Sequence, residues 1–145
     1  YPDTELEIIP GVTAATGGAA VLGAPLIHDF CLISLSDLLT PWELIERRLE
    51  DAAHGDFVVC LYNPSSVKRH DYLSKACDIM MKHKSPDTVC GIVSNIGREG
   101  EAMKVMSLRE LRDTEVDMFT TVVIGNSSTK EIKGRMVTPR GYRDV

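Results

Sequence analysis

An apolar run followed at once by a polar loop constrains this sequence most strongly. Residues 57–62 read Phe-Val-Val-Cys-Leu-Tyr, and Asn63-Pro64-Ser65-Ser66 follows directly. Such a run, rich in β-branched and aromatic residues, is typical of a strand buried on both faces. The proline ends the strand, and the serines can cap a following helix. Tyr62 and Asn63 are therefore predicted at the carboxyl end of a strand, where open α/β sheets bind ligands. The alternative is an ordinary strand-to-helix turn.

The other apolar runs alternate with helical patterns along the chain. Strands are predicted at residues 6–9, 30–35, 89–93, 102–106 and 119–124, with the one at 102–106 antiparallel and an edge pairing at 132–137. Helices are predicted at residues 12–22, 41–53 and 72–80, and a short one after Ser107. This alternation indicates an α/β fold with a mixed, mostly parallel sheet flanked by helices.

Capping residues set the expected boundaries of two helices. Thr40 as N-cap, Pro41 at the first helical position and Glu43 form a predicted capping box, and Gly55 is expected in a left-handed position after that helix. Ser107-Leu108-Arg109-Glu110 predicts a second capping box.

Small residues fill the predicted helix at 12–22. Gly17 and Gly18 cost a helix roughly 1 kcal/mol each, which indicates that another group approaches this helix closely. Tight packing against a sheet is the alternative reading. Thr13 is expected in the first turn, where free N–H groups and the positive end of the helix dipole favour polar or anionic partners.

Two predicted strand ends carry similar polar loops, Asn63–Ser66 and Asn126–Ser128. If their strands are neighbours, the two loops would lie at the same edge of the sheet. The residues therefore predict an α/β domain with a small-molecule cleft at that edge.

Charge and composition exclude several classes of function. The 145 residues suit one domain, or one domain with part of another, and the formal net charge of -5 argues against nucleic-acid binding. No apolar run approaches the ~20 residues of a membrane span. The four cysteines form no C-x-x-C pair. We therefore expect them to be small core residues, and the protein to be located in the reducing cytoplasm. Because the chain begins at Tyr1, in front of a predicted strand, we expect it to be cut from a longer protein.

No motif assigns a catalytic residue. The four histidines are scattered, so no metal site is predicted, and neither a G-x-S-x-G elbow nor a dinucleotide-binding glycine fingerprint is present. Acid–base pairs cannot be assigned from spacing, and the catalytic residues stay unknown at this point.

Six blocks of sequence, spread over nearly the whole chain, carry a resemblance to a known family. They are residues 7–15, 22–30, 33–42, 61–64, 122–127 and 135–142. Together they resemble the tetrapyrrole (corrin/porphyrin) methylases. The blocks at 33–42 and 61–64 narrow the resemblance to the branch that methylates C(17) of precorrin-3B, or of its cobalt counterpart, with ring contraction in cobalamin biosynthesis.

The resemblance implies a two-domain enzyme that holds S-adenosylmethionine in the cleft between its domains. The family's first domain, with its glycine-rich loop, has no counterpart here. Residues 1–27 would thus be the tail of the N-terminal methylase domain and a linker, and residues 28–145 the C-terminal α/β methylase domain. The fragment alone is expected to be inactive, and the full-length enzyme a homodimer.

The resemblance also carries binding roles to particular positions. The implied cofactor-binding residues are Thr13, Ala14, Leu61, Tyr62, Asn63, Pro139, Arg140 and Gly141. His28 and Asp37 are candidates for the tetrapyrrole side. In physical terms, Thr13, Tyr62 and Pro139 should border a common hollow. The alternatives are a sister methylase acting on another macrocycle carbon, and a non-enzymatic α/β ligand-binding domain.

Overall fold

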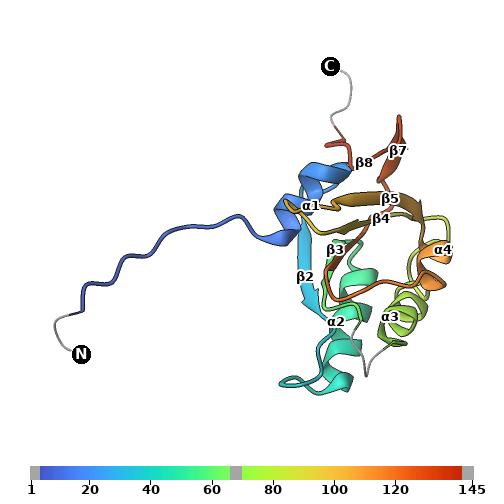
Figure 1. The fold of residues 1–145 in the computed structure, drawn as a ribbon. Coiled ribbons are helices and arrows are strands. Elements are labelled where there is room, and N and C mark those ends of the chain that lie inside the picture. The colour runs from blue at the N-terminus through green and yellow to red at the C-terminus, as the bar shows by residue number, and fades with distance from the viewer. Residues whose placement is uncertain (1–3, 66–69, 142–145) are drawn as a thin grey trace.

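A five-stranded mixed sheet forms the centre of the molecule (Figure 1). The computed structural model describes residues 4–65 and 70–141. The strands are β2 (Phe30–Ser34), β3 (Val58–Tyr62), β4 (Val89–Ser94), β5 (Ala102–Ser107) and β6 (Thr120–Ile124). They lie in the order β2-β3-β6-β4-β5. These bounds confirm the predicted strands at 30–35, 57–62, 89–93, 102–106 and 119–124 to within a residue or two.

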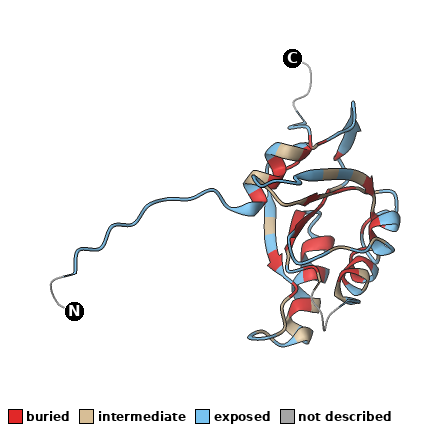
Figure 2. Ribbon diagram, viewed as in Figure 1, coloured by how far each residue is buried: buried red, intermediate tan, exposed pale blue. Residues whose placement is uncertain are grey.

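Helices cover both faces of this sheet (Figures 1 and 2). They are α1 (Ala14–Leu22), α2 (Trp42–His54), α3 (Tyr72–Met80) and α4 (Leu108–Arg112). Along β3, Val59 and Leu61 pack in one core cluster with α2, α3 and α4, whereas Val58 and Cys60 pack in a second with α1. This division explains why the run at 57–62 is apolar at every position: β3 is buried on both faces.

A small second sheet closes the far end of α1. It consists of β1 (Gly23–Ala24), β8 (Arg135–Val137) and β7 (Lys130–Ile132), in the order β1-β8-β7. The edge pairing predicted at 132–137 is confirmed only in part: β7 and β8 form an antiparallel hairpin, but its turn residues Lys133 and Gly134, both with positive φ, fall inside that range, and β8 lies between β1 and β7. α1 and β1 pack on the sheet built from later residues, and the division at residue 27 stays a prediction.

The sheet is mixed, as predicted, but parallel pairing is rarer than expected. β2 and β3 pair in parallel, whereas the β3–β6, β6–β4 and β4–β5 pairs are antiparallel. A loop of seven residues, 95–101, joins β4 to β5, and so short a connection permits only antiparallel pairing. Because β3 and β6 run in opposite directions, the polar loops at Asn63 and Asn126 lie at opposite ends of the sheet. The prediction that these two loops share one edge of the sheet was therefore wrong.

The predicted strand at residues 6–9 was also wrong. This segment is extended and pairs with no strand in the described part of the chain, and the Leu6 and Ile8 side chains are 82% and 87% exposed. The apolar residues at 6–9 match the pattern of a strand. A strand forms, however, only where a neighbouring strand offers backbone hydrogen bonds.

One predicted cap is confirmed and another is not. Ser107 and Glu110 form the expected capping box at the start of α4. At α2 the N-cap is Pro41 without a side-chain cap, one residue later than predicted from Thr40, and Gly55 has φ -76 while Asp56 takes the left-handed conformation with φ 56. Ser66, predicted as a helix cap, lies outside the described residues.

Candidate functional site

The hydroxyl of Tyr62 holds the first turn of α1 against the end of β3. Its oxygen accepts a hydrogen bond from the Ala15 backbone N–H at 2.7 Å and shares another with Thr13 Oγ1 at 2.5 Å. Thr13 is the N-cap residue of α1 but makes no side-chain cap within the helix. Tyr62 therefore satisfies a helix N–H that a local cap would normally take.

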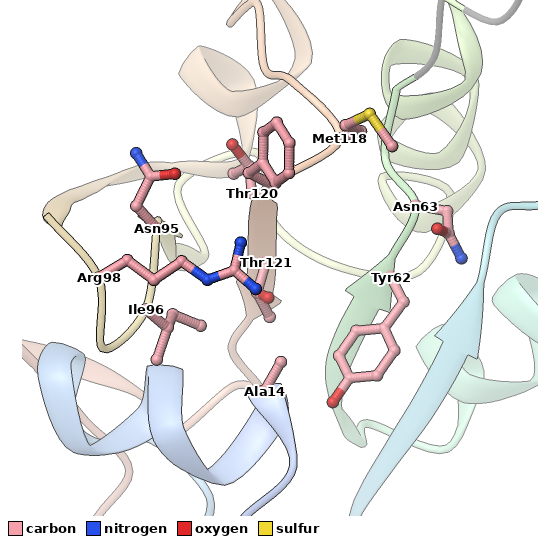
Figure 3. Close-up of a pocket in the computed structure, with 10 residues that line it drawn as sticks. Ala14, Tyr62, Asn63, Asn95, Ile96, Arg98, Met118, Thr120 and Thr121 are labelled. Carbon is pink, nitrogen blue, oxygen red and sulfur yellow. The ribbon is translucent and has the colours of Figure 1, made fainter. Parts of the chain in front are cut away.

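A cavity of about 280 Å³ opens beside this contact (Figure 3). Its lining consists of Ala14, Tyr62, Asn63, Asn95, Ile96, Arg98, Met118, Phe119, Thr120 and Thr121. Three of the implied cofactor residues, Ala14, Tyr62 and Asn63, thus lie together at one side of a hollow, and Thr13 contacts the Tyr62 hydroxyl.

Asn63 is fixed in an unusual backbone conformation at the end of β3. Its φ is 53, in the left-handed region that asparagine tolerates better than most residues. The side-chain Nδ2 donates to Ser34 Oγ at 2.9 Å, which joins the ends of β3 and β2. This end of the sheet is therefore held together by side-chain as well as backbone hydrogen bonds.

The other predicted residues do not line this cavity. The Leu61 side chain is fully buried in the core on the α2 and α3 face. Asp37 accepts a hydrogen bond from the Tyr72 hydroxyl at 2.7 Å, which ties its loop to α3. Neither residue presents its side chain to the hollow beside Tyr62.

The C-terminal segment lies beside His28. His28 Nε2 is 2.7 Å from the Arg140 carbonyl oxygen, and the Thr138 N–H donates to the Ala24 carbonyl at 3.1 Å. Pro139, Arg140 and Gly141 are not among the lining residues. Among the described residues, Pro139 therefore does not share the cavity beside Tyr62, and the binding roles of this segment stay predictions.

Most of the described lining comes from residues that the sequence did not single out as site residues. Asn95, Ile96 and Arg98 belong to the loop between β4 and β5, while Met118 and Phe119 precede β6. The two glycines of the first loop marked it only as a turn. The chain order separates these segments from Tyr62, so no local pattern could have placed them beside it.

The glycines of α1 permit the close approach that their position indicated. A Cβ on Gly17 would lie 3.1 Å from Ile96 Cγ2, and one on Gly18 would lie 3.2 Å from Ile96 Cδ1. Both distances are shorter than ordinary carbon contacts. Gly17 and Gly18 thus allow the loop that carries Ile96 to seat on α1 and close one side of the cavity.

Other expectations concern metals, thiols and membranes. Among residues 4–65 and 70–141, no cluster of three His, Cys, Asp or Glu side chains suits a metal ion, and no helix is both long and apolar enough to cross a bilayer. All four cysteines are free, and Cys60, Cys77 and Cys90 are buried as predicted for core residues.

Comparison with known proteins places the chain in a family. Residues 1–112 match the family described as Tetrapyrrole (Corrin/Porphyrin) Methylases. The chain is 50% identical over 139 residues to the cobalt-factor III methyltransferase of Priestia megaterium, covering 96% of this chain and 26% of that protein. It is 47% identical over 140 residues to the probable cobalt-factor III C(17)-methyltransferase of Salmonella typhimurium, covering 97% and 58%.

A solved structure supports the same assignment. The fold superposes on the crystal structure of the methyltransferase CobJ with a TM-score of 0.84 at 38% identity, covering 94% of this chain and 57% of that one. The chain therefore spans less than two thirds of the length of these relatives. The match over residues 1–112 and the identities near 50% show that this chain belongs to the tetrapyrrole methylase family.

Proposed function

We propose that this chain is part of an S-adenosylmethionine-dependent methyltransferase that acts at C(17) of precorrin-3B, or of its cobalt counterpart. The reaction would methylate the macrocycle and contract its ring, as a step of cobalamin biosynthesis. The observation that carries the proposal is 47% identity, over 97% of the chain, to a relative named for C(17) methylation of cobalt-factor III. A further relative, at 47% identity, is named as a cobalamin biosynthesis protein.

The cavity beside Tyr62 would form one wall of the cofactor cleft. Its volume of about 280 Å³ lies just below the ~300–1,000 Å³ typical of ligand pockets. Five of its ten lining residues are exposed, which fits a wall that a second domain would cover. The N-terminal domain of the longer relatives is the natural occupant of that position, and we propose that it completes the site.

The polar groups of this wall suit the methyl donor. Thr13, Ala14, Tyr62 and Asn63 would hold it, because they offer hydroxyl, amide and backbone groups at the end of β3 and the first turn of α1. When bound, S-adenosylmethionine supplies a methyl group that its sulfonium already makes electrophilic. The protein's task is then chiefly to align donor and acceptor carbon and to exclude water, which requires no catalytic triad.

Methyl transfer by the full-length protein tests this function. With labelled S-adenosylmethionine and either precorrin-3B or cobalt-factor III, we expect one labelled methyl group in the product, and NMR should place it at C(17) of a contracted ring. A panel of other tetrapyrroles separates this activity from that of a sister methylase. Absence of transfer to every macrocycle would leave the non-enzymatic binding domain as the better reading.

The chain by itself provides a second test. Since one wall of the cleft is missing, we expect no methyl transfer and only weak binding of S-adenosylhomocysteine in calorimetry. Tight binding by this chain alone would contradict the half-site. We further propose that the full-length enzyme is a cytoplasmic homodimer, for which light scattering should give twice the protomer mass.

A further inference from the structure

We infer that Arg98 binds a peripheral carboxylate of the tetrapyrrole substrate while Met118 and Phe119 contact the face of the macrocycle. This inference rests on the proposed function and assigns a recognition role to lining residues outside the cofactor-binding set that the resemblance implies. It concerns affinity for the macrocycle, not the transfer step itself.

Arg98 is the one charged residue among the described residues that line the cavity. Its guanidinium extends from the β4–β5 loop across the hollow towards Thr121 (Figure 3). Within the described residues, its side chain has neither a hydrogen bond nor an ion pair. A planar guanidinium with unused donors fits a carboxylate with two parallel hydrogen bonds. In a protein of net charge -5, an arginine that lines a cavity, is exposed there and has no partner among the described residues favours an anionic ligand group.

Hydrogen bonds within the loop that carries Arg98 fix its backbone. The Arg98 N–H donates to the Asn95 carbonyl at 2.9 Å, and the Glu101 N–H donates to the Arg98 carbonyl at 3.2 Å. Glu101 Oε2 accepts from the Gly97 N–H at 2.7 Å, so the Glu101 carboxylate binds the loop backbone. Together with Ile96 seated on α1, these bonds hold the backbone from which Arg98 reaches the cavity.

Two large apolar side chains in the lining, those of Met118 and Phe119, form an exposed rim of the cavity. Met118 is 67% exposed and Phe119 is 54% exposed, although both are large apolar residues. Asp117 Oδ1 accepts hydrogen bonds from the Phe119 N–H at 3.0 Å and from Thr120 Oγ1 at 2.8 Å, which fixes the turn that presents them. An aromatic ring and a thioether in the same cavity lining as a cation match a flat apolar macrocycle with carboxylates at its edge.

The position of Arg98 favours the macrocycle over the methyl donor. The carboxylate of S-adenosylmethionine is the competing anion for this cavity. Tyr62 and Asn63, two of the residues to which the family resemblance assigns the donor, lie across the hollow from Arg98, Ile96 and Asn95, whereas Ala14, a third, lies below the guanidinium in this view (Figure 3). Precorrin-3B and its cobalt counterpart carry acetate and propionate side chains, which are ionised at neutral pH. We therefore assign the arginine to one of these.

Substitution of Arg98 in the full-length protein tests the assignment. We expect Arg98→Gln to raise the KM for the tetrapyrrole roughly 10-fold to 100-fold, the loss typical of a hydrogen-bonded charge pair. The kcat and the Kd of S-adenosylhomocysteine should stay within about twofold, because uniform substrate binding affects KM alone. The KM of Arg98→Lys should lie between those of the wild type and Arg98→Gln, because the lysine ammonium keeps the charge but cannot form the two parallel hydrogen bonds of a guanidinium. Arg48→Gln, an exposed arginine on α2, is the matched control and should change none of these values.

A chemical arm identifies the carboxylate. With a tetrapyrrole whose peripheral carboxylates are esterified, the difference in affinity between wild type and Arg98→Gln should vanish. An unchanged tetrapyrrole KM in Arg98→Gln would overturn the inference. So would a weakened Kd for S-adenosylhomocysteine with an unchanged tetrapyrrole KM, since that result assigns Arg98 to the methyl donor. Both outcomes presuppose that the wild type methylates C(17), so they are distinct from failure of the proposed function.

Discussion

The phenol oxygen of Tyr62 lies 2.7 Å from the backbone nitrogen of Ala15, which is only 1% exposed. This hydrogen bond joins the last residue of β3 to the first turn of α1, across 47 positions of sequence. A single side chain thus holds together two of the segments that line the cavity. Stability and the geometry of the site should therefore change together when it is removed.

Tyr62→Phe removes that hydroxyl and leaves the buried Ala15 N–H without its partner. We expect a loss of about 1–3 kcal/mol in the free energy of unfolding, the usual cost of an unsatisfied buried donor. Urea denaturation of the 145-residue chain measures it. Thr13→Val is the matched variant, because it removes the exposed partner of the same hydroxyl, and it should cost less than half as much. Equal stability of Tyr62→Phe and wild type would show that water or another group replaces the hydroxyl.

Gly91 of β4 lies directly against the side chain of Leu22 of α1. A Cβ at this position would lie 2.5 Å from Leu22 Cδ2 and 2.9 Å from Leu22 Cδ1, and Leu22 is fully buried. Gly91→Ala should therefore destabilise the chain by about 1–3 kcal/mol through overpacking. Gly11→Ala is the control, since nothing lies within 4 Å of a Cβ there. Urea midpoints that agree for the two variants would indicate that Leu22 moves aside freely.

Local patterns predicted most of the elements but not their arrangement. The apolar run at 57–62 identified β3 because burial on both faces leaves no polar position, and Ser107 identified the start of α4 because its capping box is local. The direction of β6 against β3 is set by the connections between strands, which composition does not encode. The contacts of Tyr62 with Thr13 and of Ile96 with Gly17 join distant segments, so the helix of small residues indicated a close approach without naming the partner.

The same distinction applies to the site. Tyr62 and Asn63 were predictable because the end of a buried strand is a local signal, and both line the cavity. Arg98 and Phe119 were not, because an arginine in a turn and an apolar residue before a strand are ordinary in sequence. Only the antiparallel return of β6 beside β4 brings these two segments to one rim.

The cysteines should differ sharply in reactivity. Burial raises the pKa of Cys60 to about 12 and that of Cys77 to about 12, and it also raises the pKa of Cys90. Cys31 is half-buried, and burial raises the pKa of its thiol too, although Lys84 opposes the shift. Because the thiolate is the reactive species, we expect a disulfide reagent at pH 8 to modify at most Cys31, slowly, in the native chain.

Unfolding provides the reference for this measurement. In denaturant all four thiols should react rapidly, since none is engaged in a disulfide. Cys31→Ser is the matched variant and should abolish the native reaction while leaving three reactive thiols after unfolding. Rapid native modification of two or more thiols would mean that the sheet opens more readily than its packing indicates.

Asp56 should contribute to the acid sensitivity of the fold. Burial acts to raise the pKa of this carboxyl, but hydrogen bonds from the Ser127 hydroxyl and N–H, at 2.6 Å and 3.0 Å, and the nearby Lys84 ammonium hold it below its ordinary value of 3.8. A carboxyl with a lowered pKa in the folded state stabilises that state fully above its unfolded pKa. This contribution is therefore present above pH 3.8 and is lost as pH falls through the folded pKa.

Lys84 responds to pH in the opposite range. It is 6% exposed, and its Nζ donates to the Phe57 carbonyl at 2.9 Å. Burial lowers the pKa of Lys84, against the attraction of Asp56, so the unfolded chain binds more protons at alkaline pH and stability rises there as pH increases. Measurements in the acid range therefore report the titration of Asp56 without a contribution from the titration of Lys84.

Asp56→Asn should therefore flatten the pH dependence of unfolding below about pH 4, because the amide does not titrate. It should also lower stability at pH 7, where the buried Lys84 loses its counter-charge. Urea titrations between pH 2.5 and 7 measure both effects, and Asp51→Asn, an exposed carboxylate on α2, controls for the loss of one acidic group. If the acid limbs of Asp56→Asn and Asp51→Asn coincide, the hydrogen bonds from Ser127 contribute nothing to the protonation equilibrium, and the acid sensitivity must originate from other carboxyl groups.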